Sequence, residues 1–461
     1  RAGMTTRLKC GVVGALLVFG CARRPSAPVG VGVNVPKAQG PAAEVPAAPA
    51  EQTCFEPAAK GERSGVGGVV HCEVAASRSY CVAESATRKP VIVQLGATGA
   101  LVETSIPART EHVAQESASS LRFLTDGKPP RWFTVDLSNP DLPEVSAAVE
   151  VPGLEHAGAL KAFASDGARA LVGRYLIDYA TKPTRYYGET ALYSVHDGKR
   201  IGAVVPLTAW SGVCRRGTCL AVASGEGVAA PFEVLKIGDA GFERLGQLDR
   251  NCGGFVQWVD GERWIIARPL KAGIELVAVD FGSPRLVRKR VSLTAECPEI
   301  RHAVFAGRSG VVLRTADRGS VFVPLSSQLA AGAPEALPRS DSSERSFAPL
   351  LHGALMVEQT IGGGMRHSPT DSRGIRRYYR TWSFDGRAEL LRAGAGARSW
   401  KSAGSIGLPH SGEDGEFSYG FRAHPLVRPG FAAVFVDDRP GGESEVLVVG
   451  RPCRRSVQSD R

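Results

Sequence analysis

The sequence lacks the local patterns that usually identify an enzyme or a metalloprotein. It has no Gly-x-Ser-x-Gly elbow, no His-Glu-x-x-His motif and no phosphate-binding loop. No Cys-x-x-Cys pair occurs, which argues against a zinc ribbon or a thioredoxin-like site. The nine histidines are scattered singly, and no dense Lys/Arg run interleaved with aromatics indicates a nucleic-acid groove. The sequence therefore predicts no metal, no cofactor and no nucleic-acid partner, but a catalytic site assembled from distant segments stays open.

Long runs with helical periodicity are also scarce. Glycine is abundant, with 54 residues, and short apolar runs alternate with turn residues along most of the chain. With 461 residues, of which 43% are hydrophobic, the chain can bury a sizeable core. These features favour an all-β protein. The net charge of +10 is typical of a solvated basic surface.

The N-terminus has the pattern of an export signal. Met4 is the expected start, and a basic segment with Arg7 and Lys9 precedes a short apolar run that ends at Gly20. Residues 1–20 are therefore predicted to be a signal peptide, too short to span a bilayer comfortably. The ending Val-Phe-Gly-Cys resembles the bacterial lipobox, which implies lipid attachment at Cys21 and, because Ala22 follows, the outer membrane. The alternative is an ordinary secretory signal with a spare cysteine.

The segment after the signal is rich in Ala, Pro and Val. Frequent proline prevents a helix and predicts an extended, semi-rigid tether over residues 21–52. A globular body is expected over residues 53–455, and residues 456–461 are expected to be a disordered tail. The tether would hold the body, expected to be a monomer, away from the membrane to which the lipid attaches it.

Eight cysteines remain after the leader cysteine and Cys21 are set aside. An even number in an exported chain predicts disulfides rather than metal sites. Two pairs are close in sequence and suit cross-strand bridges at hairpins, and two pairs are left over. The predicted bridges are Cys72–Cys81, Cys214–Cys219, Cys252–Cys297 and Cys54–Cys453, the last joining the start of the body to its end.

A four-strand unit recurs along the body. One unit lies around residues 168–207, where two apolar runs are followed by an Asp197-Gly198 hairpin turn and a third run. The third strands serve as markers, at 91–95, 132–135, 192–195, 234–237, 276–279, 321–323, 381–384 and 446–449. In the seventh unit the four strands are expected as APLLHG, ALMVEQT, YYRTWSFDG and AELLRAG.

Four short strands in each unit of about 40 to 60 residues are typical of propeller blades. One such sheet cannot bury both faces alone, whereas radial packing buries them between neighbours and leaves only short edges. The markers predict a single β-propeller of about eight blades, with seven as the alternative. The last unit has no clear fourth strand, so the segment around residues 54–70 is expected to supply it and to close the ring.

Residues 133–153 carry a resemblance to a known group. A strand ending in Asp136 is followed by Ser138, Pro140 and Pro143, and Pro152-Gly153 closes the segment. This pattern resembles secreted bacterial and archaeal β-propeller proteins. The resemblance implies the fold and secretion, and no activity, because propellers host unrelated functions.

Three units are longer than the rest, with inserts expected at residues 179–189, 360–377 and 408–428. The first two fall between the second and third strands and so emerge on one face of the ring. Long loops on a rigid scaffold are where function concentrates. Guanidinium groups and aromatic faces suit anionic or glycan ligands, so the candidate ligand-binding residues are Arg185, Tyr186, Tyr187, Arg366, His367, Arg373, Arg376 and Arg377. Solvated, variable loops are the alternative. In the third insert Glu413, Asp414 and Glu416 are expected to be a solvated acidic turn rather than a calcium site.

These observations predict a lipid-anchored cell-envelope module that binds a protein or glycan partner through its loop-bearing face. The alternative is a periplasmic or surface hydrolase or lyase that acts on an anionic carbohydrate. A central channel with paired carboxylates and a histidine would favour the enzyme, whereas an exposed aromatic and basic rim would favour binding.

Overall fold

The computed structural model divides into two compact units, residues 1–48 and residues 49–461. All residues that the structure describes belong to the second unit. They are residues 62–64, 66–75, 78–85, 87–108, 110, 112–117, 119–125, 127–152, 154, 158–178, 185–225, 230–248, 252, 254–292, 297–314, 319–339, 344–350, 353–367, 378–393, 399–408, 414–416, 422–428, 431–437 and 444–450. Cys21 and the segments predicted to be a signal peptide, a tether and a tail lie outside them.

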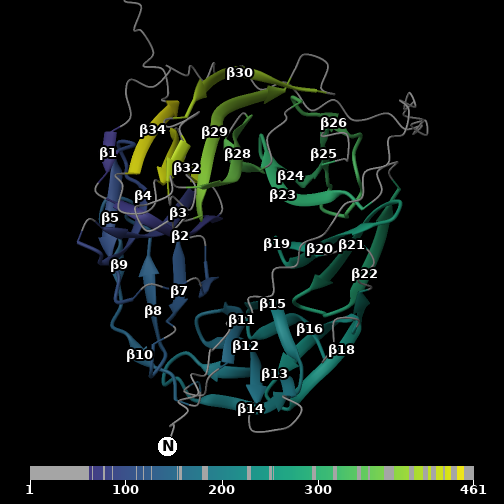
Figure 1. Ribbon diagram of the computed structural model, residues 1–461. Helices are drawn as coiled ribbons and strands as arrows, with labels where there is room; N and C mark the ends of the chain where they lie inside the picture. Colours follow the sequence, from purple (N-terminus) through teal and green to yellow (C-terminus); the bar gives the residue numbers. More distant parts are fainter. Residues whose placement is uncertain are drawn as a thin grey trace, which may run out of the picture. The chain divides into compact units, whose positions relative to one another are not determined.

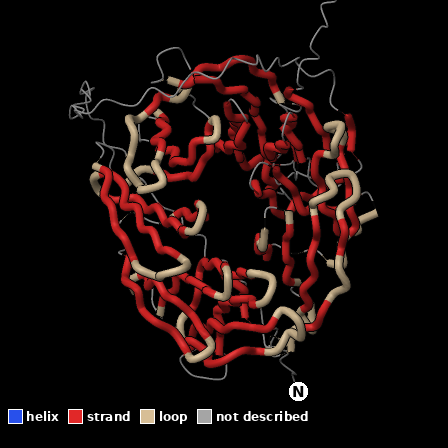
Figure 2. Tube along the Cα trace, turned by 180° about the vertical axis from the view of Figure 1, so that it is seen from behind, coloured by secondary structure: helices blue, strands red, loops and turns tan. Residues whose placement is uncertain are grey.

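Every regular element of the described residues is a strand (Figure 2). Blade 1 contains β2 (Val66–Ala75), β3 (Arg78–Ser85), β4 (Pro90–Leu95) and β5 (Leu101–Ser105), and blade 2 contains β6 (His112–Gln115), β7 (Ser120–Leu124), β8 (Arg131–Asp136), β9 (Glu144–Val145) and β10 (Val149–Glu150). Blade 3 contains β11 (Gly158–Ser165), β12 (Arg169–Asp178), β13 (Arg185–Ser194) and β14 (Arg200–Val205), and blade 4 contains β15 (Thr208–Arg215), β16 (Thr218–Ser224), β17 (Phe232–Gly238) and β18 (Gly241–Leu248).

The other four blades follow the same antiparallel order. Blade 5 contains β19 (Val256–Asp260), β20 (Arg263–Leu270), β21 (Gly273–Asp280) and β22 (Leu286–Val291), and blade 6 contains β23 (Glu299–Phe305), β24 (Arg308–Arg314), β25 (Ser320–Pro324) and β26 (Glu335–Ala336). Blade 7 contains β27 (Glu344–Leu350), β28 (Gly353–His367), β29 (Tyr378–Ala393), β30 (Trp400–Gly407) and β31 (Asp414–Glu416), and blade 8 contains β32 (Arg422–Arg428), β33 (Phe431–Asp437) and β34 (Ser444–Gly450) with β1 (Glu62–Ser64).

The hydrophobic core lies between the sheets. Side chains alternate along each strand, so the middle strands bury apolar residues on both faces. Each of eight apolar clusters joins two neighbouring sheets, from blades 1 and 2 round to blades 8 and 1. This pattern closes the ring, and Figure 1 shows β11, β15 and β19 toward its centre with β14, β18 and β22 toward its outside. The predicted all-β propeller is confirmed, and the described strands form eight sheets.

The ring closes by mixing the two ends of the body, as the sequence predicted. The strand β1 pairs antiparallel with β34, with Arg63 opposite Glu445, and becomes the fourth strand of blade 8. The chain then continues directly into the first strand of blade 1. This pairing supplies the outer strand that the last unit lacks, because β34 would otherwise present an unpaired edge.

The eight marker segments all lie on third strands, but the prediction for the seventh unit was wrong in one respect. Asp385-Gly386 is not a hairpin turn, because Asp385 pairs with Thr360 and Gly386 with Gln359 within one continuous ladder. The segment AELLRAG is therefore mostly the second half of β29, and the fourth strand is β30. An Asp-Gly pair permits a turn but does not require one when a partner strand continues alongside. At Asp197-Gly198 the turn does form, and Gly198 has a φ of 68°.

Three predicted disulfides are present. Cys72–Cys81 and Cys214–Cys219 join the first and second strands of blades 1 and 4, where the cysteines lie directly opposite each other. Cys252–Cys297 spans 45 residues around blade 5. Cys54 and Cys453 lie outside the described residues, so their pairing stays a prediction.

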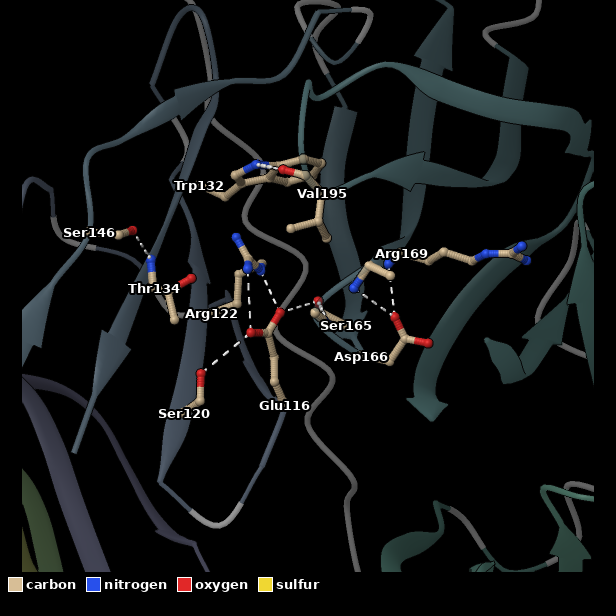
Figure 3. A network of polar contacts seen from close by, with 12 residues as sticks. Glu116, Ser120, Arg122, Trp132, Thr134, Ser146, Ser165, Asp166, Arg169 and Val195 are labelled. Atoms are coloured by element: carbon tan, nitrogen blue, oxygen red, sulfur yellow. Dashed lines mark hydrogen bonds and ion pairs between the residues drawn. The ribbon is translucent and has the colours of Figure 1, made fainter. Parts of the chain in front are cut away.

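Polar contacts also join adjacent blades, as Figure 3 shows for blades 2 and 3. Glu116, at the end of β6, accepts hydrogen bonds from Arg122 in its own blade, with a 2.5 Å contact to Nε, and from Ser165 in the next. The indole of Trp132 donates to the backbone oxygen of Val195 at 3.1 Å. Because these groups have partners within the scaffold, we interpret them as structural.

Candidate functional site

Two hairpins extend one face of the propeller, which we call the hairpin face. It is the end of the sheets where second strands lead to third strands and where first strands begin. The antiparallel ladder of β12 and β13 continues to the pair Asp178–Arg185, and that of β28 and β29 continues to the pair His367–Tyr378. Blades 3 and 7 are four places apart in the ring of eight and hence opposite each other. The predicted position of the two inserts on one face is consistent with this strand order.

The inserts are built differently from the prediction. Arg185, Tyr186 and Tyr187 do not lie in a loop, because they form the start of β13 opposite Asp178, Ile177 and Leu176. Arg366 and His367 likewise belong to β28. Of these five side chains the structure describes only that of Tyr187, which is 45% exposed. Arg373, Arg376 and Arg377 lie outside the described residues. A ladder that lengthens a hairpin satisfies backbone groups that a loop would leave to water.

The predicted acidic turn is also partly wrong. Asp414–Glu416 is the short strand β31, which pairs with residues 381–383 of β29. It adds an edge to the extended hairpin of blade 7. Glu413 lies outside the described residues. The described part of the chain contains no group of three or more His, Cys, Asp or Glu side chains that could hold a metal ion.

Two β-bulges mark the inner rim of blades 3 and 4 near the hairpin face. In β11 the residues Leu160 and Ala162 pair with Arg174 and Gly173, which leaves Lys161 as the extra residue. In β15 the extra residue is Trp210, between the paired residues 209 and 211. A bulge redirects the side chain of its unpaired residue, and bulges are frequent next to binding and active sites. Both side chains are exposed although they lie on innermost strands.

Lys161, Tyr175 and Trp210 come together at this point, and we call them the Trp210 cluster. The ammonium of Lys161 lies 5.8 Å from the centre of the Trp210 ring, within the range of a cation–π interaction. The Tyr175 ring is 6.4 Å from the indole at an angle of 38°. The indole N–H donates to Ser224 Oγ at 2.7 Å. This bond holds the polar edge of the indole against the sheet and leaves ring surface exposed.

Two glycines bring the backbone of β15 close to blade 3. A Cβ on Gly173 would lie 2.5 Å from the Ala209 oxygen, and one on Gly188 would lie 2.2 Å from the Thr208 nitrogen. Any larger residue would push the start of β15 away from blade 3. The hydroxyl of Thr190 fixes the same segment, because it donates to Leu207 O at 2.6 Å and accepts from Ala209 N at 2.8 Å. The position of Trp210 is therefore set by the packing of two blades.

Ion pairs with at least one buried side chain recur in blades 3, 5 and 7. Arg174 and Glu189 are 2.6 Å apart, Arg268 and Glu275 are 2.6 Å apart, and Glu358 contacts Arg387 at 2.7 Å. Each pair joins the sixth residue of a second strand to the residue opposite it on the third strand. Paired in this way, the charges neutralise each other inside the sheet.

In blade 7 two further charged groups lie close to this ion pair. Glu358 also contacts Arg345, and the neighbouring Glu389 carboxyl has a raised pKa because burial disfavours its charged form. The repeated register and the internal partners indicate a structural device.

The histidine with the clearest surroundings is His302, on the first strand of blade 6. Its ring stacks on Trp258 of blade 5 with centroids 4.4 Å apart, and its Nε2 lies 3.1 Å from Ser309 Oγ. Burial lowers the pKa of this imidazole to about 4, so it is neutral at pH 7. Its position between two blades indicates a packing role.

Sequence reasoning did not identify the Trp210 cluster. Lys161 and Tyr175 lie in ordinary strand sequence, and Trp210 follows an apolar run that reads as a buried strand. A bulge depends on the partner strand and leaves no local signal of its own. Lys161 and Trp210 are 49 residues apart in the sequence, and their contact becomes visible only when their strands lie side by side.

No helix in the described part of the chain is long and apolar enough to cross a membrane. No family model matches this chain. No curated protein matches it.

Solved structures similar to this chain include three propeller-containing or catalytic proteins. The periplasmic gluconolactonase PpgL of Pseudomonas aeruginosa has 12% identity and a TM-score of 0.39, over 76% of this chain and 98% of that chain. The Dos1 propeller has 9% identity and a TM-score of 0.41, over 86% and 95%. The acylaminoacyl peptidase of Pyrococcus horikoshii has 10% identity and a TM-score of 0.43, over 81% and 57%. Such similarities assign no activity to this chain, and the propeller assignment rests on its own sheet topology.

Proposed function

We propose that this protein is a lipid-anchored module of the bacterial outer membrane that binds a protein or glycan partner over the hairpin face. The lipobox-like sequence ending at Cys21 supports the anchor, and the proline-rich tether supports a body held away from the lipid. The propeller supplies a rigid ring on which binding elements are mounted.

One observation carries the binding role: the hairpin face combines extended strands with an exposed aromatic and basic group on the inner rim. Trp210 is 39% exposed and Tyr187 is 45% exposed, whereas most tryptophan and tyrosine side chains of a packed propeller are expected between blades. Aromatic side chains that keep a polar contact while exposing ring surface are enriched at recognition sites. An exposed rim of this kind favours binding over the hydrolase or lyase alternative.

The anchor and the binding face are tested separately. For the anchor, cells that express the full chain are labelled with a radioactive fatty acid. We expect label on the wild type and none on Cys21→Ala. Label that persists on the variant, or that is absent from the wild type, would contradict the lipoprotein assignment.

For the binding face, residues 361–384 are replaced by an Asn-Gly turn between Thr360 and Asp385, which already pair across the ladder. Lys199→Gln, at the exposed turn on the opposite face, is the matched control. We expect the shortened variant to lose the partner that wild type and control capture from envelope extracts, with its melting temperature within a few degrees of theirs. Equal capture by all three proteins would refute the role of this face.

A further inference from the structure

Trp210 differs from the other tryptophans of the propeller. Among the five whose side chains the structure describes, Trp132, Trp264 and Trp400 are buried and Trp258 is 9% exposed, whereas Trp210 is 39% exposed. Its indole N–H is already bonded to the buried Ser224. What remains for a ligand is therefore the apolar ring surface rather than a hydrogen-bond donor.

The exposure of Trp210 results from the way its strand is bulged. Lys161 and Trp210 are the extra residues at corresponding places of adjacent first strands, and each bulge turns its side chain out of the regular alternation. Gly173 and Gly188 admit the backbone that carries Trp210. A ring held by a hydrogen bond and by a fixed backbone loses little conformational entropy when it binds a ligand.

The charge at the site restricts the ligand class. Among the described side chains, none forms an ion pair with Lys161, whose ammonium lies over the indole. The positive charge of this ammonium disfavours cationic ligands, and a neutral ligand would offer it no oppositely charged partner. A ligand that offers an apolar ring face and a carboxylate would satisfy both the aromatic surface and the cation.

We propose that the Trp210 cluster is a binding subsite for an acidic sugar, such as a uronate or sialate residue of an oligosaccharide. The apolar face of the sugar ring packs on Trp210 and Tyr175, and its carboxylate pairs with Lys161. This inference rests on the proposed binding function and names its ligand as a glycan. The two remain separable, because the hairpin of blade 7 lies across the ring from this subsite.

The test is calorimetric titration of the full chain with three acidic probes: trigalacturonic acid, a hyaluronan tetrasaccharide and sialyllactose. Each is compared with a neutral oligosaccharide of similar length. We expect at least one acidic probe to bind and to be preferred over its neutral counterpart. Trp210→Ala should weaken binding by at least about tenfold, the usual effect of losing one aromatic stacking surface. Lys161→Gln should abolish the preference for the acid while neutral sugars bind as before.

The chain offers a matched control on an outer strand. Phe242 is 38% exposed, and the guanidinium of Arg244 lies 5.8 Å from the centre of its ring, the same separation as in the Trp210 cluster. Phe242→Ala should leave binding unchanged, which separates the site from the general effect of an exposed aromatic beside a cation.

Three outcomes would overturn the subsite: no binding of any acidic probe, binding unaffected by Trp210→Ala, or an acid preference that survives Lys161→Gln. If the subsite fails while the shortened blade 7 hairpin still abolishes partner capture, the binding function stands and only the acidic-sugar subsite is refuted. If the hairpin result fails as well, the proposed function fails with it.

Discussion

We predict that His302 makes the stability of the propeller depend on pH. The imidazole is half-buried between blades 5 and 6, stacked on Trp258, with the hydroxyl of Ser309 at its Nε2. Burial lowers its pKa from 6.5 to about 4. The folded protein therefore keeps this ring neutral over a pH range in which the unfolded chain takes up a proton.

The direction follows from proton binding in the two states. Between pH 6.5 and pH 4 the unfolded state binds more protons at this position, so stability falls as the pH falls. The contribution is complete above about pH 6.5 and is lost progressively toward pH 4. One pKa unit corresponds to about 1.4 kcal/mol, so lowering the pH from 7 to 5 removes roughly 2 kcal/mol of unfolding free energy through His302 alone.

The assay is urea unfolding at pH 7 and pH 5 for the wild type, His302→Gln and His196→Gln. His196 is exposed and serves as the control. We expect His302→Gln to be less stable at pH 7, because it loses the stacked ring, but to lose roughly 2 kcal/mol less than the wild type between the two pH values. The same pH dependence in all three proteins would refute the reasoning, because it would mean that the buried imidazole is not the group responsible.

Two further changes test how the blades are held. Gly188→Ala should destabilise the protein by about 1–3 kcal/mol and weaken glycan binding at the Trp210 cluster, because the added methyl group displaces the start of β15. Thermal unfolding and glycan titration of the variant measure the two effects. Unchanged values would show that the close approach of Gly188 to β15 is not required. Replacing both cysteines of Cys252–Cys297 by serine should cost about 4 kcal/mol, against about 2 kcal/mol for Cys214–Cys219, because the first bridge closes a loop of 45 rather than 5 residues. Urea unfolding of the two double variants checks whether loss of Cys252–Cys297 costs more stability than loss of Cys214–Cys219, as the chain-entropy argument requires.

The architecture was predictable because its signals are local. A propeller blade is a series of short antiparallel strands, and each strand and turn appears in sequence as an apolar run followed by turn residues. The close cysteine pairs were predictable for the same reason, since a hairpin places Cys214 opposite Cys219. The exception is instructive: Asp385-Gly386 has turn chemistry, yet the long partner strand β28 keeps it within the ladder.

The candidate site was not predictable in the same way. The sequence identified the lengths of the inserts, but the described residues of the inserts include strand segments that pair with strands outside them. Residues 185–189 pair with 174–178, residues 360–367 with 378–385, and residues 414–416 with 381–383. Arg185 and Arg366 were assigned to loops on composition, although each has a backbone partner across its hairpin. Composition alone cannot distinguish a loop from a hairpin whose register is fixed by the sheet below it.

The sequence by itself determined an all-β chain of repeated four-strand units, its two close disulfides and the closure of the ring by an N-terminal strand, since each depends on neighbouring residues or on a simple count of strands. Only the tertiary structure decided that Lys161, Tyr175 and Trp210 meet. Their contact requires two bulges in different blades and two glycines that let those blades approach. The spacing of residues along one strand cannot encode such an arrangement, because it arises where two sheets pack together.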